Sequence, residues 1–258
     1  MNPLARFAQL VQAPEQDLPL DEAALLVATC VRPVDVHAGL ARLDDLASGC
    51  RGRDATGVSE YLFLESGFAG DTVDYDDPRN SFLDDVMARR LGIPISLSVL
   101  MIEVARRVDV TLRGIGMPGH FLVRDERRPD RYFDPFHGGA SIDAAGAEAL
   151  FHAVRGEERF RPEYLDPIGR RATLSRMLAN LQRSFLRRQA GAVAPVARMR
   201  LAIPGLPVTE RYHLATLLGS IGQYDEAAAL LEGLADKLGD ADAARVRQQV
   251  VAFRARGN

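Results

Sequence analysis

The sequence is poor in cysteine and has no long apolar run. Only Cys30 and Cys50 occur among 258 residues, which excludes a disulfide scaffold and a multi-cysteine metal site. No run approaches the roughly 18 apolar residues of a membrane-spanning helix. The opening segment, MNPLARFAQLVQAPEQD, carries charge and proline too early for a signal peptide. We therefore expect a soluble, cytoplasmic protein with no membrane partner.

Lysine is also nearly absent, since Lys237 is the single lysine among 32 basic residues. With 35 acidic residues the net charge is −3, and 47% of the residues are hydrophobic. These values fit a globular protein with a sizeable core, and they exclude a wholesale binder of nucleic acid or membrane surfaces.

The basic charge is unevenly distributed along the chain. Between Asp166 and Glu210 there is no acidic residue, whereas eight arginines occur there, so this stretch carries +8 and the rest carries −11. We interpret it as a solvated helix face or as a counter-charge for the acidic N-terminal half. Nucleic-acid binding favours aromatic side chains among the arginines. Phe185 is the only one here and belongs to an apolar helix face, so we do not expect a nucleic-acid partner.

The first hundred residues are predicted to be helical. Apolar spacing typical of helices covers Leu18 to Cys30, Val34 to Ala47 and Thr56 to Phe68. An acidic segment, GDTVDYDDPRN, follows and is predicted to be a solvated loop, because it lacks the glycine and distal glutamate of a calcium loop. Ser81 is the expected N-cap of the next helix, with Asp84 in the capping-box position.

The segment SLSVLMIEVARRV predicts a helix that begins near Ser96. Its apolar residues surround the helix axis almost completely, and only the polar side with Glu103, Arg106 and Arg107 is expected to be solvated. A helix that is apolar on nearly all sides is buried. We therefore expect this to be the central helix of the fold.

Short β-prone segments follow the central helix: LRGIGMP, HFLVRD and RYFDP. The last two form a predicted hairpin around the turn ERRPD. Pairing Arg124 with Asp130 places opposite charges across the turn. The same register places His120 opposite Asp134, and a slip by one residue would send them to opposite faces.

From Ala144 onward the sequence is predicted to be helical again. The helix Thr173 to Gln189 has an apolar face made of Leu174, Leu178, Leu181 and Phe185. After the break at Pro204 and Pro207, helices at Glu210–Gly222 and Asp225–Leu238 form a pair. The string LATLLGSIGQYDEAAALLEGL is similar to a tetratricopeptide hairpin. A single repeat does not make a solenoid, so we expect it to cap the preceding helices.

Three strings, NSFLDDVMARRLGIPISLSVLMIEVARR, MPGHFLVR and YFDPFHGG, resemble bacterial transglutaminase-like proteins of the SirB type, which carry a tetratricopeptide-like C-terminal region. The resemblance is strong from Asn80 to Gly139 and loose in the C-terminal part. It implies an α+β fold in which helical N-terminal segments precede a papain- or transglutaminase-like core, a buried helix on an antiparallel sheet. We expect a transglutaminase-like domain at 1–166 and a helical region at 167–258.

The resemblance also implies a site. In active transglutaminase-like enzymes, a cysteine at the start of the central helix attacks an amide, assisted by a histidine and an aspartate. His120 and Asp134 match that pair. The position of the cysteine falls within GIPIS, so Ser96 is its nearest counterpart and Ser98 the alternate. A serine hydroxyl gains little from a helix dipole and needs a close base.

Each of these residues also has a structural interpretation. Ser96 is also a natural helix N-cap, His120 can bridge a strand and a loop, and Asp134 can be a turn residue before Pro135. With His137, the residues His120 and Asp134 would also make a three-ligand metal site, for which the sequence shows no supporting outer partners. We assign no metal and no cofactor.

Two functions from different classes follow from this sequence. The first is a non-catalytic scaffold that binds a protein or peptide partner in the former active-site cleft and on the C-terminal helices. The alternative is a Ser-His-Asp hydrolase or acyl transferase that acts on an amide or ester through Ser96. A nucleic-acid regulator acting through the arginine stretch is a third interpretation.

Overall fold

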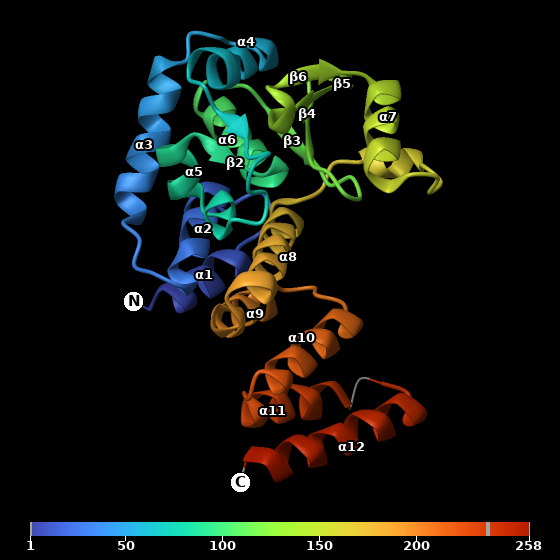
Figure 1. Ribbon diagram of the computed structural model, residues 1–258. Coiled ribbons are helices and arrows are strands. Elements are labelled where there is room, and N and C mark those ends of the chain that lie inside the picture. The colour runs from blue at the N-terminus through green and yellow to red at the C-terminus, as the bar shows by residue number, and fades with distance from the viewer. Residues whose placement is uncertain (1, 236–237, 258) are drawn as a thin grey trace.

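The computed structural model describes residues 2–235 and 238–257, and its fold is α+β and mostly helical (Figure 1). Lys237 and part of the predicted helix Asp225–Leu238 lie outside the described residues. None of the helices in the described residues is long and apolar enough to cross a membrane. The helices are α1 Pro3–Gln12, α2 Leu20–Leu26, α3 Val36–Gly49, α4 Ala55–Ser59, α5 Leu83–Arg89, α6 Pro94–Arg107, α7 Ala144–Arg155, α8 Arg170–Arg188, α9 Val193–Ala202, α10 Val208–Ser220, α11 Tyr224–Ala235 and α12 Asp240–Gly257.

The predicted N-terminal helices are confirmed, with two irregularities. Helix α2 ends in a 3₁₀ turn at Val27–Cys30, and α4 continues as a π-helical segment at Glu60–Glu65. The prediction of Ser81 as an N-cap is wrong. Ser81 ends a 3₁₀ turn that is capped by the Asp77 carboxylate, and Phe82 is the residue that precedes α5.

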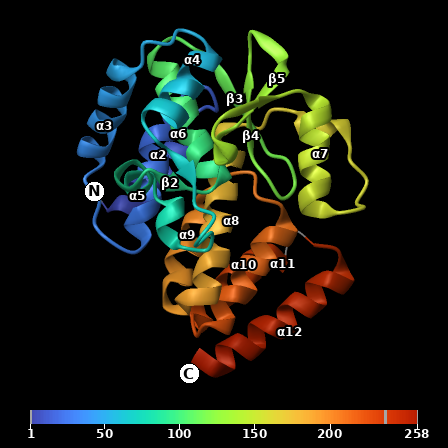
Figure 2. The ribbon, with the colours of Figure 1, turned by 45° about the horizontal axis from the view of Figure 1, so that its top comes forward.

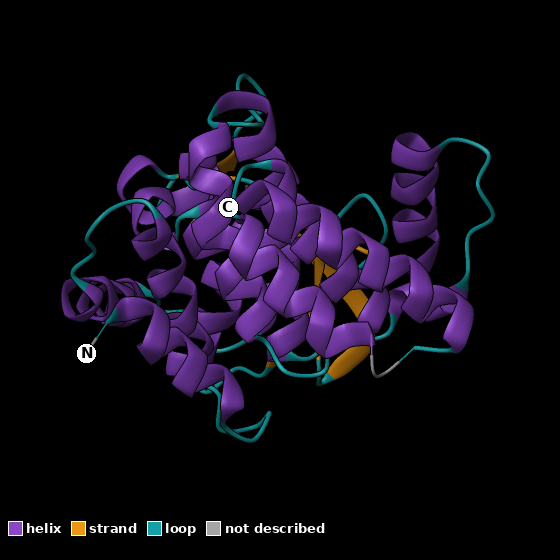
Figure 3. Ribbon diagram, turned by 90° about the horizontal axis from the view of Figure 1, so that it is seen from below, coloured by secondary structure: helices purple, strands orange, loops and turns teal. Residues whose placement is uncertain are grey.

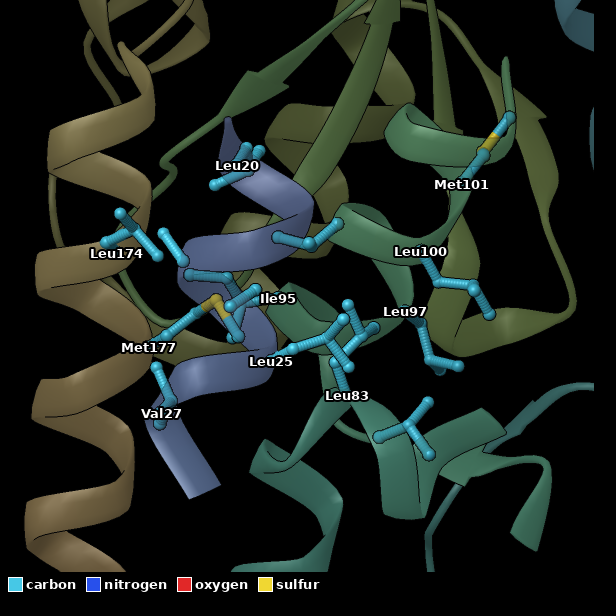
Figure 4. Packing of buried hydrophobic residues seen from close by; sticks show 14 of the residues in the cluster. Leu20, Leu25, Val27, Leu83, Ile95, Leu97, Leu100, Met101, Leu174 and Met177 are labelled. Carbon is cyan, nitrogen blue, oxygen red and sulfur yellow. The ribbon is translucent and has the colours of Figure 1, made fainter. Parts of the chain in front are cut away.

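The central helix is α6, as predicted, and it begins at Pro94. Its side chains meet those of α2 and α8 in one core, in which Leu25, Ile95 and Met177 lie together (Figure 4). The expectation that its polar side is solvated is wrong at Glu103, which is 1% exposed. Glu103 is buried because Arg106 and Arg107, one turn further on, both bind its carboxylate.

The strands β3 Leu112–Ile115, β4 Leu122–Asp125, β5 Arg128–Asp134 and β6 Ala140–Ile142 form an antiparallel sheet in that order. Helix α6 packs on one face of this sheet, against Val123 and Phe133. Helix α7 packs on the other face, where Ala147 and Phe151 join Leu122 and Tyr132 in a small apolar core (Figure 2). A separate short parallel pair joins β1 Ala69–Gly70 to β2 Leu91–Gly92. The predicted buried helix on an antiparallel sheet is therefore present.

The predicted hairpin register is wrong by two residues. Arg124 pairs with Tyr132, and not with Asp130, because the ladder is irregular between Arg124 and Asp125 and the chain reverses at the pair Asp125–Arg128. For the pairs Val123–Phe133 and Arg124–Tyr132 the shift is even, and an even shift keeps side chains on their predicted face. His120 and Asp134 therefore remain on the same side of the hairpin.

The apolar face predicted for α8 is confirmed, since Leu174, Leu178, Leu181 and Phe185 are all buried. Helices α8 and α9 share one core with the N-terminal helices. Helices α10 to α12 enclose a second core and extend away from the sheet (Figure 1). Viewed from below, this helical layer lies in front of the strands (Figure 3). The domain boundary between residues 166 and 167 stays a prediction, and apolar packing continues across it.

Three residues of the arginine stretch bind acidic residues of the N-terminal half, as the counter-charge interpretation expects, whereas two bind Glu210 and Glu226 of the C-terminal helices. Two of its partners, Asp74 and Asp76, lie in the acidic segment, which is therefore docked on α8. Within that segment Asp71 and Asp77 are buried and both bind Arg89, so the prediction of a purely solvated loop is wrong. The ion pairs of the stretch are Arg171–Glu15, Arg187–Asp76, Arg188–Asp74, Arg198–Glu226 and Arg200–Glu210.

Candidate functional site

A cleft of about 920 Å³ opens between α8, the acidic segment, the end of α7 and the loop that precedes β4. Its apolar lining includes Ile93, Pro94 and Ile95 from the start of α6. Arginines of α7 and α8 and two histidines provide most of its polar lining. The charged and imidazole side chains that line it are Asp76, Asp77, His120, His137, Arg155, Arg176, Arg183 and Arg187.

His120 and Asp134 meet in the wall of this cleft. The His120 Nε2 atom lies 2.9 Å from Asp134 Oδ1, and both side chains are at most 5% exposed. His120 lies in the loop before β4, where Gly119 has φ +83°, a left-handed conformation that glycine adopts without strain. Asp134 is the last residue of β5. The predicted proximity of the two side chains is therefore confirmed.

Asp134 also organises the turn that follows it. Its Oδ1 accepts the backbone N–H groups of Phe136 and His137, at 3.1 and 3.3 Å, so that it caps the 3₁₀ turn Pro135–His137. Its Oδ2 lies 2.6 Å from His137 Nδ1. Burial acts to raise the pKa of the Asp134 carboxyl, but hydrogen bonds from His120 and His137 outweigh it and hold that pKa below its ordinary value. Asp134 is thus both a turn residue and a member of the site.

His137 is a third member of this cluster. Its ring stacks on that of His120, with centroids 5.6 Å apart and an interplanar angle of 20°, and its side chain is 54% exposed. Phe136 contacts both rings edge-on. From the sequence, His137 was predicted only as a possible metal ligand. Its contact with Asp134 could have been predicted from its position three residues later, after the turn-forming Pro135.

Ser96 is held away from the cluster. It is the third residue of α6 and not its N-cap, which is Ile93. Its hydroxyl donates to the Asn80 carbonyl at 2.6 Å and accepts the Ile93 N–H at 3.1 Å, with the residue fully buried. In the described residues no hydrogen bond joins Ser96 to His120, and Ser96 does not line the cleft.

Neither the alternate serine nor the cysteines occupy the expected place of the nucleophile. Ser98 is fully buried and donates to the Pro94 carbonyl one turn earlier. Burial raises the pKa of the Cys30 thiol to about 12 and also raises that of Cys50. Neither cysteine is among the residues that line the cleft. The catalytic roles assigned to Ser96 and Ser98 stay predictions.

Arg176 of α8 holds the loop that carries His120. Its guanidinium donates to the carbonyls of Gly116, Met117 and His120 and lies over the Phe121 ring, 5.5 Å from its centroid. Burial is the largest effect on its pKa, which lies below the ordinary value. Sequence reasoning placed Arg176 only among the arginines of the +8 stretch, because the loop it binds is about sixty residues away in the chain.

A buried helix that packs on an antiparallel sheet, with a histidine–aspartate pair in the wall of a cleft, fits a transglutaminase-like core. The comparison with protein families agrees. The family model described as the transglutaminase-like superfamily matches residues 33–179, and the chain belongs to this superfamily.

Curated relatives match parts of this chain. A UPF0162 protein of Xylella fastidiosa is 46% identical over 134 residues, which cover 48% of this chain and 46% of the relative. A UPF0162 protein of Vibrio cholerae is 31% identical over 136 residues, or 52% and 50% of the two chains. The human F-box only protein 21 is 40% identical over 67 residues, 26% of this chain and 11% of that protein. The matches thus span about half the length of these bacterial relatives.

Proposed function

We propose that this chain is a non-catalytic transglutaminase-like protein of the SirB type that binds a protein or peptide segment in its cleft. The observation that supports the proposal is the start of α6. There the residues that line the cleft are Ile93, Pro94 and Ile95, which carry no nucleophile. The next residue, Ser96, is hydrogen-bonded to the backbone of Asn80 and Ile93. Among the described residues, the start of α6 therefore presents no hydroxyl or thiol to the cleft, and this supports a site without the nucleophile that acyl transfer requires.

The shape and lining of the cleft support binding of an extended segment. A volume of about 920 Å³ is at the upper end of the range typical of ligand pockets. Tyr75 and Val154 border it and are 46% and 50% exposed, and Arg183 and Arg187 add charged groups. The lining thus offers apolar contacts for peptide side chains together with charged groups for polar ones. Helices α10 to α12, which we take to be tetratricopeptide-like, supply a second surface for the same partner.

An activity measurement tests the non-catalytic part of the proposal. The intact protein is treated with a fluorophosphonate probe for activated serines and assayed against activated esters and anilide amides. We expect no labelling of Ser96 and no turnover above that of the Ser96→Ala variant. Ser96→Cys should gain no amidase activity, since the new thiol faces Asn80. Turnover that is lost in both Ser96→Ala and His120→Ala would establish the alternative, a serine hydrolase or acyl transferase.

A peptide-selection experiment tests the binding part. Phage-displayed peptides of random sequence are selected on the intact protein, and the enriched peptides are synthesised for titration. Ala179→Trp fills the cleft from α8, whereas Ala172→Trp adds the same side chain to an exposed position of that helix outside the cleft. We expect peptide binding to be lost only in Ala179→Trp. Absence of any enriched peptide, or equal binding to both variants, would contradict the proposal.

A further inference from the structure

Three potential metal-binding side chains converge at the wall of the cleft. One donor atom from each of His120, Asp134 and His137 lies within 4.8 Å of the other two. Two imidazoles and one carboxylate form a donor set that suits zinc and other divalent transition metals. The set differs from a chance surface cluster because the side chains of His120 and Asp134 are 5% and 4% exposed.

The distances are close to those that a metal ion requires. Around a four-coordinate zinc ion with bonds of about 2.0–2.1 Å, neighbouring donor atoms lie about 3.3 Å apart. Here His120 Nε2 and His137 Nδ1 lie 2.9 and 2.6 Å from the two oxygens of Asp134. Opening each contact by less than about 1 Å makes room for the ion. The ion would then replace the imidazole protons that now face the carboxylate.

Surrounding contacts orient these donors, as outer partners do in established metal sites. The backbone N–H groups of Phe136 and His137 hold Asp134 Oδ1. Arg176 binds the His120 carbonyl and so restrains the backbone from which that imidazole projects. Phe136 contacts both imidazole rings edge-on. The donors are therefore restrained before any ion binds, which lowers the entropic cost of binding.

The cluster is open to the cleft on the side where His137 lies. The His137 side chain is 54% exposed, and both histidines line the cleft. An ion held by three protein side chains next to an open volume keeps a coordination position for water or a ligand group.

We propose that His120, Asp134 and His137 form a binding site for a divalent transition metal ion, with zinc as the best match to the donor set. Asp134 bridges the two imidazoles when the ion is absent. The site lies in the wall of the proposed peptide cleft, but the metal proposal does not rest on peptide binding or on the identity of a nucleophile, so its test can fail while the proposed function holds.

Calorimetric titration with zinc chloride tests the proposal on the intact protein after treatment with chelator and dialysis. We expect one zinc ion per chain, and His137→Ala should weaken its binding by at least about tenfold. His137 is the ligand to replace because it is exposed, and circular dichroism will show whether the variant is folded. His152→Ala is the matched control, since His152 is an exposed histidine of α7 outside the cluster.

Cobalt provides a second readout that a merely structural role of His137 would not change. Co²⁺ bound by four or five ligands absorbs visible light strongly, whereas the hydrated ion absorbs weakly. The expected spectrum appears with the parent protein and with His152→Ala, and is lost with His137→Ala. The proposal is overturned if the parent protein binds no zinc, or if His137→Ala and His152→Ala bind it equally.

Discussion

At the scale of single residues, Asp134 is the most constrained group of the site. One carboxylate accepts two backbone N–H groups and faces two imidazoles. Hydrogen bonds to a charged group contribute more than those between neutral groups, and a buried charge without partners is costly. Asp134 therefore stabilises both the loop that carries His120 and the turn Pro135–His137.

Replacing this carboxylate with an amide measures how much its negative charge contributes to the free energy of unfolding. We expect Asp134→Asn to lower the free energy of unfolding by about 1.5–3 kcal/mol at neutral pH, because the charged hydrogen bonds become neutral. The pKa of Asp134 lies below its ordinary value in the folded protein. The contribution is thus complete above the unfolded pKa of about 3.9 and is lost as pH falls through the folded pKa.

Urea unfolding of both proteins over a range of pH measures this difference. Asp143→Asn is the control, because Asp143 also caps a helical turn but is exposed and has no imidazole partner. Asparagine caps helices about as well as aspartate, so this variant should match the parent at every pH. A difference for Asp134→Asn that did not change between neutral and acid pH would contradict the explanation.

Ser96 and Ser98 offer a second contrast between single residues. The Ser96 hydroxyl is a partner of both the Asn80 carbonyl and the Ile93 N–H, whereas Ser98 adds a bond to a carbonyl within its own helix. Ser96→Ala leaves buried groups unpaired, so we expect it to lower the free energy of unfolding by about 2–4 kcal/mol. Ser98→Ala should cost less than about 1 kcal/mol. Equal losses in chemical denaturation would show that the Ser96 contacts contribute no more than an ordinary helical serine.

At the scale of elements, α8 joins the cleft to the rest of the protein. Its apolar face enters the main core, and its polar face binds the acidic segment through Arg187 and Arg188. Arg176 connects it to the loop of His120. The orientation of the candidate site therefore depends on a helix that comes after the sheet in the sequence.

The Arg176 contact can be tested by a conservative change. Lysine keeps the charge but not the planar group that reaches three carbonyls. We expect Arg176→Lys to lower the free energy of unfolding by about 1–3 kcal/mol and to speed amide hydrogen exchange in the loop that carries His120.

Arg183→Lys is the control for this experiment. Arg183 is exposed and donates only to Asn180 of its own helix among the described residues, so the loop should exchange as in the parent protein. Unchanged exchange in Arg176→Lys would mean that the backbone of the loop is restrained by other contacts.

At the scale of the whole molecule, the described residues form three apolar cores. The larger of the two helical cores contains residues from α1 to α6, α8 and α9, and the smaller belongs mainly to α10, α11 and α12. A third, small core lies between the sheet and α7. Removing α8 would expose the side chains that meet Leu174, Leu178 and Phe185. Removing α10 to α12 would leave the larger core complete.

Two truncations distinguish these possibilities. We expect the fragment 1–207 to fold cooperatively with near-native helicity, because it keeps every residue of the larger core up to Ile203. The fragment 1–166, which ends at the predicted domain boundary, should be unfolded or aggregated. Circular dichroism and thermal unfolding measure both. A stable, cooperative fragment 1–166 would show that α8 is an appendage rather than part of the first unit.

Much of this architecture could be predicted from patterns within short segments. The all-round apolar character of α6 predicted a buried helix, and four apolar residues predicted the inner face of α8. The strand segments and the proximity of His120 to Asp134 were also predicted. Two local predictions were wrong because of turn geometry. Ser81 is not an N-cap, because it ends a 3₁₀ turn that Asp77 caps. The predicted pairing of Arg124 with Asp130 is wrong because the ladder is irregular beside Arg124.

Periodicity and composition thus sufficed for the elements, because burial on one face leaves a repeating pattern in adjacent residues. They did not suffice for partners distant in the sequence. That Ser96 bonds to Asn80, that His137 stacks on His120, and that Arg176 holds the loop before β4 all depend on how separate elements dock. Docking depends on shape and on hydrogen-bond geometry in three dimensions, which a linear pattern does not record. The candidate cluster is therefore a product of packing, although each of its members was visible in the sequence.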